Sequence, residues 1–285
     1  MAEKITTEVI RNWVVTTTGT FTYKDLFFEK GITDPANMDY AYVVMKRLCE
    51  ERLIKAINGR HGSFRLLDKD APILNWKGVK DYTGIDILWP FELEKFVKIY
   101  PRNIIVVGGD PNKGKTAFLH NVISLNWRKH DIALWDSENS KQELALRFAE
   151  YEDHELWPGD IARERSKDFA DVIEEYNPDG INIIDYLEIT ENFYAVGKFL
   201  REIRDALGKG IAIVAIQKAK GAELPIGRDF SQQIARLVLT IDPGILTIRK
   251  AKSFAQRNVN PNNMKFKFRL KDGAHFEDIQ ESWMA

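Results

Sequence analysis

The sequence predicts an α/β protein whose mostly parallel sheet is covered by helices on both faces and preceded by a small domain of three helices and a β-hairpin. Two observations indicate this fold. From residue 103 onward, short continuous apolar runs alternate with helical patterns, which is typical of parallel strands buried between two helix layers. The first 68 residues have a separate hydrophobic pattern, and the chain of 285 residues is long enough for two domains.

Composition restricts the class of protein. Hydrophobic residues make up 44% of the chain and charged residues 29%, as in a globular protein with a sizeable core. The formal net charge is −1, so a nucleic-acid surface would require local segregation of charge. Cys49 is the only cysteine, which excludes an intramolecular disulfide and fits a reducing compartment. No apolar signal core or spanning run is present, and we expect a soluble cytoplasmic protein with no membrane partner.

The N-terminal pattern predicts a domain over residues 1–68. Helical spacing is found over residues 5–17, 24–30 and 37–52, and residues 53–67 read as a hairpin around the turn 58–62. Three helices followed by a β-hairpin resemble the winged-helix family. The resemblance covers about the first seventy residues and is one of pattern, without a diagnostic motif.

The segment 69–102 is predicted to be a linker and a lead-in helix, because glycine, proline and aromatic residues interrupt it. The second domain is predicted over residues 103–285. Its expected strands are residues 104–107, 132–135, 181–184, 211–216, 237–241 and 245–248.

A phosphate-binding loop follows the first of these strands. Gly109 is separated by four residues from Gly114, Lys115 and Thr116, and a helical pattern begins at once. In such a loop the backbone N–H groups and the helix N-terminus hold phosphates, the lysine neutralises them and the threonine ligates Mg²⁺. A glycine turn without a ligand is the alternative. The predicted nucleotide contacts are Gly109, Asp110, Pro111, Asn112, Lys113, Gly114, Lys115, Thr116 and Ala117.

Three more polar residues stand at or just after the ends of apolar strands. They are Glu138, Asp185 and Gln217. Open α/β sheets place their ligand crevice at this edge, so we expect the three side chains near the phosphate loop. The alternatives are a solvated loop acid for Glu138, a cap or turn residue for Asp185, and a sheet-end hydrogen bond for Gln217.

These segments resemble the RecA-like ATPases, and within them the DnaB-type hexameric replicative helicases. The resemblance rests on residues 114–118, 137–147, 183–187 and 213–217, and it spans about residues 85 to 276. It implies ATP and Mg²⁺ as ligands, with Glu138 as the general base and Lys115 facing the phosphates. It also implies that Asp185 reaches Mg²⁺ through water, that Gln217 senses the γ-phosphate, and that the chain forms a homo-oligomer, a hexameric ring.

A basic segment over residues 245–271 contains no acid. In the DnaB-like pattern, a lysine and an arginine two residues apart on this strand reach the neighbouring subunit's γ-phosphate. Lys250 and Lys252 take those places here, with a lysine at the second. A lysine is a point charge without the planar fork of an arginine. A solvated basic edge is the alternative.

DNA is the expected macromolecular partner. Single-stranded DNA would be contacted by the loop after the glutamine strand, and duplex DNA by the third helix and hairpin of the first domain. A solvated face or a protein-docking domain is the alternative for the latter. The predicted DNA contacts are Lys218, Lys220 and Arg228 in the loop, and Lys46, Arg47, Arg60 and Arg65 in the first domain.

Three functions remain open from the sequence. The first is a DNA-dependent ATPase acting as a helicase or translocase in a phage or mobile element. The second is an ATP-switched DNA-binding initiation, partition or regulatory factor without unwinding activity. The third, a small-molecule kinase, is disfavoured because no lid or acceptor motif is visible. Residues 1–68 do not resemble the primase-binding helical domain of DnaB-type helicases.

Overall fold

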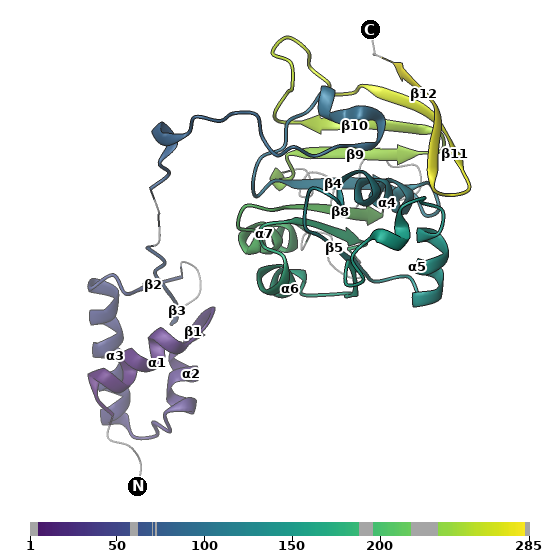
Figure 1. Cartoon of the computed structure of the whole chain (residues 1–285). Coiled ribbons are helices and arrows are strands. Elements are labelled where there is room, and N and C mark those ends of the chain that lie inside the picture. The colour runs from purple at the N-terminus through teal and green to yellow at the C-terminus, as the bar shows by residue number, and fades with distance from the viewer. Residues whose placement is uncertain are drawn as a thin grey trace. The chain divides into compact units, whose positions relative to one another are not determined.

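The computed structural model in Figure 1 describes residues 5–57, 62–69, 71, 73–187, 196–217 and 233–282. The chain divides into two compact units, Met1–Val79 and Lys80–Ala285. Each unit has its own hydrophobic core. Together they confirm the predicted class, a large mostly parallel sheet flanked by helices with a small helix-and-sheet unit at the N-terminus.

The N-terminal unit is built from three helices and a three-stranded antiparallel sheet of order β1-β3-β2. Side chains cap all three helices at their N-termini, where backbone N–H groups lack partners. The strand between the first two helices pairs with the second hairpin strand, which closes the sheet over the helices. In chain order the elements are α1 (Thr7–Thr16), β1 (Thr20–Thr22), α2 (Tyr23–Glu29), α3 (Pro35–Glu50), β2 (Ile54–Ala56) and β3 (Ser63–Leu66).

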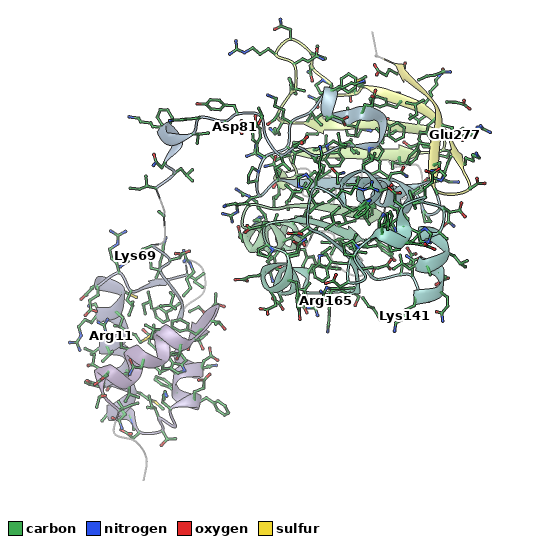
Figure 2. All side chains as sticks on the ribbon, in the orientation of Figure 1. Arg11, Lys69, Asp81, Lys141, Arg165 and Glu277 are labelled. Atoms are coloured by element: carbon green, nitrogen blue, oxygen red, sulfur yellow. The ribbon has the colours of Figure 1, made fainter. Side chains whose placement is uncertain are left out.

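Aromatic side chains fill the core of this unit. Phe21 of β1 lies edge-on to Trp13 and stacks on Phe64. On the surface, Arg11 of α1, which is labelled in Figure 2, pairs with Glu51 at the end of α3. The element order agrees with the predicted three helices and hairpin, and membership of the winged-helix family stays a prediction.

The second unit contains a nine-stranded sheet of order β12-β11-β10-β9-β4-β8-β7-β5-β6. The six strands from β9 to β6 in that order are parallel, and β10, β11 and β12 extend the sheet as an antiparallel edge. The strands are β4 (Ile104–Gly109), β5 (Ile132–Asp136), β6 (Ala162–Glu164), β7 (Ile181–Asp185), β8 (Ile211–Gln217), β9 (Leu237–Asp242), β10 (Ile245–Ala251), β11 (Lys265–Lys271) and β12 (His275–Ser282).

Helices cover both faces of this sheet because its central strands are apolar on both sides (Figure 1). One core lies between the sheet and α4 (Lys115–Asn126), with α5 (Lys141–Phe148) packed against it. The other lies under α6 (Phe169–Tyr176) and α7 (Val196–Ala206). No described helix is long and apolar enough to cross a membrane.

Residues 80–102 belong to the second unit. Within them, a 3₁₀ turn over Pro90–Lys95 takes the place expected for a lead-in helix. Phe91 of this turn is buried against Phe118 and Phe276. The segment before the first strand therefore contributes to the core that supports the candidate site. Two further 3₁₀ turns lie at Trp76–Gly78 and His154–Leu156.

Candidate active site

The loop between β4 and α4 has the backbone of a phosphate-binding loop. β4 ends at Gly109, α4 begins at Lys115, and Gly114 between them has a φ of 100°. That left-handed conformation strains any residue with a Cβ. A Cβ on Gly109 would lie 2.8 Å from the carbonyl oxygen of Ile241, so the close approach of β9 also requires glycine there. The loop leaves the N-terminus of α4 facing the pocket that is described below.

Lys115 is buried at the base of the loop, with 8% of its surface exposed. Its Nζ donates to the carbonyl oxygens of Gly109, at 3.0 Å, and Asp110, at 2.9 Å. Burial lowers the pKa of Lys115, and the nearby carboxylates of Asp185, Glu138 and Asp110 oppose the shift. The cation is thus held beside acidic groups by loop carbonyls that a phosphate can replace.

Asp185 ends β7 with only 1% of its surface exposed. The Thr116 hydroxyl donates to its carboxylate, while its Oδ2 is buried without a hydrogen-bond partner among the described residues. Burial raises the pKa of Asp185 to about 6, and repulsion from Asp136 and Glu138 adds to the rise. A buried, unsatisfied carboxylate oxygen beside a threonine hydroxyl is the donor set that a hard divalent cation prefers.

Glu138 is exposed and stands two residues after β5, on a turn that Asp136 holds in place. Asp136 Oδ1 accepts from the backbone N–H groups of Glu138 and Asn139, both at 2.8 Å. Its Oδ2 accepts from Asn139 Nδ2 at 2.7 Å. Asp136 therefore holds the turn that carries Glu138, and it was not among the site residues predicted from the sequence. The signal was an acid at a strand end two residues before the candidate base.

Gln217 ends β8, directly opposite Gly109 in the parallel pairing of β8 with β4. Its side chain lines the same pocket as Glu138 and Asp185. The strand ends thus bring together most of the predicted site. The described pocket is lined by Pro111, Asn112, Lys113, Gly114, Lys115, Thr116, Ala117, Glu138, Asn139, Glu143, Arg147, Asp185, Tyr186, Gln217, Leu270 and Gly273.

Two segments of this lining were not predicted. Glu143 and Arg147 come from α5, where Glu143 also forms a capping box with Ser140. Leu270 and Gly273 come from the β11–β12 hairpin. A Cβ on Gly114 would lie within 3.5 Å of Leu270, so the hairpin packs directly on the phosphate loop.

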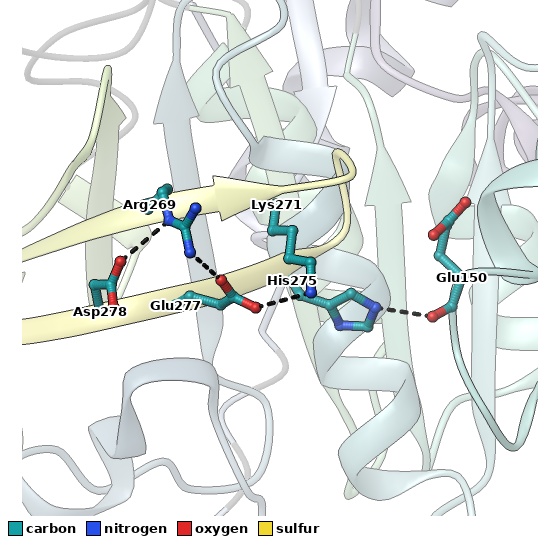
Figure 3. Close-up of polar contacts among 6 residues, drawn as sticks. All are labelled: Glu150, Arg269, Lys271, His275, Glu277 and Asp278. Carbon is teal, nitrogen blue, oxygen red and sulfur yellow. Dashed lines mark hydrogen bonds and ion pairs between the residues drawn. The ribbon is translucent and has the colours of Figure 1, made fainter.

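Hydrogen bonds tie the turn of this hairpin to α4 and to the end of α5. Asn121 Nδ2 donates to the carbonyl oxygen of Ala274 at 2.6 Å and also to the Tyr151 hydroxyl at 3.2 Å. His275 Nε2 lies 2.9 Å from the carbonyl oxygen of Glu150 (Figure 3). These contacts fix the turn as one wall of the pocket.

Ion pairs across the two strands reinforce the hairpin (Figure 3). Arg269 pairs with Glu277 at 2.6 Å and with Asp278 at 3.1 Å. Lys271 also pairs with Glu277, at 3.3 Å. Two of the cations in the basic segment therefore form ion pairs with acids of β12.

Lys250 and Lys252 lie at the opposite end of the sheet from this pocket. β9 runs parallel to β4 and pairs Ile241 with Gly109 at the loop end, whereas β10 runs antiparallel to β9 and pairs Ala251 with Leu237 at the far end. The two lysines cannot therefore act on a nucleotide bound by their own chain. A role in the site of a neighbouring subunit stays a prediction.

The predicted DNA contacts are only partly described. Lys46 and Arg47 are exposed on α3, and Arg65 is exposed on β3, where it lies opposite Lys55. Arg60, Lys218, Lys220 and Arg228 lie outside the described residues. DNA binding by either set stays a prediction.

Comparison with known proteins places few constraints on the chain. No protein-family model matches it, and no curated protein matches its sequence. Among solved structures it is similar to the flagellar accessory protein FlaH from Methanocaldococcus jannaschii, with 12% sequence identity and a TM-score of 0.46. The alignment covers 66% of this chain and 92% of FlaH. The assignment of an α/β fold with a phosphate-binding loop therefore rests on the strand order and loop geometry given above.

Proposed function

We propose that the protein is a RecA-like P-loop ATPase that hydrolyses ATP with Mg²⁺. One observation carries the proposal: Lys115, the Thr116–Asp185 pair and Glu138 converge on a single pocket at the carboxyl ends of parallel strands. Hydrolysis of a phosphoanhydride needs a phosphate cradle, a metal, a positioned water and charge compensation. The described residues supply a group for each requirement.

The phosphate cradle consists of the loop backbone and Lys115. The left-handed Gly114 turns the chain into α4, and a phosphate at this helix N-terminus replaces the loop carbonyls as acceptor of the Lys115 ammonium. The Thr116 hydroxyl and Asp185 Oδ2, which has no hydrogen-bond partner among the described residues, would suit Mg²⁺, with Asp185 acting directly or through water. Bound Mg²⁺ would neutralise charge that develops on the phosphate oxygens.

Glu138 is the group best placed to orient and deprotonate the attacking water. It lines the pocket, it is exposed to solvent, and its backbone is held by Asp136. Gln217 at the neighbouring strand end supplies an amide that can contact the terminal phosphate. In this arrangement a proton leaves water for the Glu138 carboxylate as the water oxygen bonds to the γ-phosphorus, while the bond from that phosphorus to the β,γ-bridging oxygen breaks and ADP leaves with phosphate as the second product.

The test is ATP turnover by the purified chain with Mg²⁺, compared with the Lys115→Ala variant. We expect turnover by the wild type and its loss in the variant, with weakened ATP binding, since the cation facing the phosphates is removed. Lys129→Ala is the matched control, because Lys129 is an exposed lysine beyond the C-terminal end of α4 and does not line the pocket. Undiminished turnover by Lys115→Ala would contradict the proposal.

As a more specific activity, we propose that DNA stimulates this ATPase and that the enzyme acts as a helicase, translocase or DNA remodeller. The exposed cations of α3 and β3 support contact with a phosphate backbone by the N-terminal unit, which we propose is a winged helix. The alternative is an ATP-switched DNA-binding factor without unwinding activity. Turnover measured with single-stranded, duplex or no DNA, together with a strand-separation assay, distinguishes the two.

We further propose a homo-oligomer, a hexameric ring, in which Lys250 and Lys252 act on the nucleotide of the neighbouring subunit. Their distance from their own pocket supports this arrangement. The test mixes Lys115→Ala with Lys250→Ala, so that some interfaces pair an intact loop with an intact lysine. Partial recovery of turnover is expected. A mixture as inactive as its components, despite co-assembly shown by mass measurement, would contradict the shared site.

A further inference from the structure

Ser137 fastens the turn after β5 to the end of the neighbouring strand β7. It stands between Asp136, which ends β5, and Glu138, the proposed base. The backbone N–H of Ser137 donates to the carbonyl oxygen of Asp185 at 3.0 Å. Asp136 and Asp185 are the last directly paired residues of the two parallel strands, so this bond keeps the strand ends together where the chain turns toward the pocket.

The hydroxyl of Ser137 makes a second connection to β7. Its Oγ accepts from the backbone N–H of Tyr186 at 3.2 Å and donates to the carbonyl oxygen of the same residue at 3.1 Å. The carbonyl oxygen of Asp185 lies 3.4 Å from the same Oγ. A hydroxyl can fill both roles because it is at once a donor and an acceptor. An alanine in its place would remove these side-chain bonds and keep the backbone bond.

The end of β7 is a fixed support for this connection. Asp185 is buried, and its carboxylate accepts from the Thr116 hydroxyl of the phosphate loop. On the other side, the backbone N–H of Leu187 donates to the carbonyl oxygen of Ala215 in β8 at 3.0 Å. The residues that Ser137 contacts are therefore held by the loop on one side and by the sheet on the other.

Glu138 depends on its backbone for its position. Its carboxylate is exposed and makes no hydrogen bond or ion pair with a described residue. The three bonds to Asp136 set the shape of the turn that carries it. The bonds of Ser137 attach that turn to the strand of Asp185, and so set where the carboxylate stands relative to the rest of the pocket.

We propose that Ser137 is a positioning residue, which holds the Glu138 carboxylate in place for the attacking water by fastening its turn to the end of β7. The proposal rests on the proposed ATPase function. Misplacing a reacting group by about 1 Å can cost on the order of 10²-fold in rate. Because Asp136 keeps the shape of the turn when the hydroxyl is lost, we expect a smaller loss, of about 10-fold in kcat, from Ser137→Ala.

The experiment measures ATP turnover by the full-length variants Ser137→Ala and Ser137→Thr. The alanine variant should lose kcat while its KM for ATP stays within about twofold of the wild type, as for a group that matters in the transition state. The threonine variant keeps the hydroxyl and should keep most of the turnover. Ser124→Ala is the matched control, because Ser124 is a half-buried serine of α4 that does not line the described pocket.

A double variant tests whether Ser137 acts through Glu138. With the base already removed by Glu138→Gln, adding Ser137→Ala should lower turnover by less than about twofold further, because residues that act as a unit are not additive. A serine that only supports the fold would give the full loss in both backgrounds. The Mg²⁺ concentration for half-maximal turnover should be the same in Ser137→Ala and the wild type.

Four results would overturn the role of Ser137 while the ATPase proposal stands. They are wild-type kcat in Ser137→Ala, the full further loss in the double variant, an equal loss in Ser137→Thr, and a raised Mg²⁺ requirement in Ser137→Ala. The last would place the effect at Asp185 instead of Glu138. No turnover by the wild type would refute the ATPase proposal and the role of Ser137 with it.

Discussion

Asp136 and Asp185 are directly paired in register at the ends of the neighbouring parallel strands β5 and β7, and both are buried. Their partners differ. Asp136 accepts three hydrogen bonds from the turn that carries Glu138, whereas Asp185 accepts one from Thr116 and keeps a buried oxygen without a partner among the described residues. Two adjacent carboxylates therefore have different surroundings: one holds the turn, and the other keeps an oxygen that, in the proposed function, would face a cation.

The first prediction concerns Glu138 as the base. Glu138→Gln removes the proton acceptor and keeps the size of the side chain, so ATP should still bind while turnover falls about 10²-fold or more. Nucleotide binding by fluorescence and turnover by phosphate release measure the two effects separately. Glu143→Gln is the control, because Glu143 lines the pocket from α5 and caps its helix. Lost affinity with normal chemistry would make Glu138 a structural residue.

The second prediction concerns Asp136 as the residue that positions Glu138. Asp136→Ala leaves two backbone N–H groups and one amide without their acceptor. A buried group that loses its partner costs about 1 to 3 kcal/mol of stability. We expect lower kcat with a nearly constant KM for ATP, and a smaller effect from Asn139→Ala, which removes a single side-chain bond. Equal kinetics for Asp136→Ala and the wild type would exclude a positioning role.

The third prediction is a pH dependence of stability due to His120. This side chain is buried against Phe148 and Tyr151, and burial lowers its pKa from 6.5 to about 3, with Arg147 adding to the shift. Between these values the unfolded chain binds a proton that the folded chain does not. The His120 contribution to the free energy of unfolding is therefore complete above pH 6.5. As the pH falls toward 3, it decreases by up to about 1.4 kcal/mol per pH unit.

Urea unfolding at several pH values checks this prediction. His120→Leu should show a shallower loss of stability with acid than the wild type, because the variant has no imidazole to protonate on unfolding. His154→Leu is the control, since His154 is less buried. If the free energy of unfolding falls with acid equally in the wild type and in His120→Leu, the imidazole is protonated in the folded state and the prediction is wrong.

The fourth prediction concerns the hairpin wall. Asn121→Ala removes the donor to the Ala274 carbonyl oxygen and one donor to the Tyr151 hydroxyl. The turn should loosen, and ATP affinity should fall several-fold while kcat stays nearly constant, because Glu138 and Asp185 are unchanged. Amide hydrogen exchange in residues 271–275 should rise in the variant. Unchanged exchange there would mean that the remaining contacts of the turn, which are Tyr151 with Ala274, His275 with Glu150 and Leu270 with Gly114, are sufficient to hold the wall.

The phosphate loop and the strand-end residues could be predicted because their signals are local. Gly109 to Thr116 lie within one strand-loop-helix unit, and Asp185 ends a mainly apolar strand. Parallel strands then bring such ends together, whatever their separation in sequence. Asp136 was overlooked because a carboxylate at a strand end has the same pattern whether it caps a turn or meets a ligand.

The hairpin wall could not be predicted for a different reason. Leu270 reaches Gly114 across more than 150 residues of sequence, Gly273 lines the same pocket, and neither belongs to a motif. Helical spacing also has limits, since Val43 fits the pattern of α3 but is 62% exposed, whereas Met45 is buried. Which face of a helix becomes buried depends on the elements that pack against it. The spacing of apolar residues alone does not identify those elements.

The ties between the β11–β12 turn and α4 have a consequence for biosynthesis. A ribosome makes the phosphate loop long before it makes Ala274 and His275, which complete the wall against Asn121 and Glu150. During translation the nascent chain thus carries a loop that can meet phosphates without the wall that completes the pocket. Full nucleotide affinity should therefore arise only after the hairpin has left the ribosome.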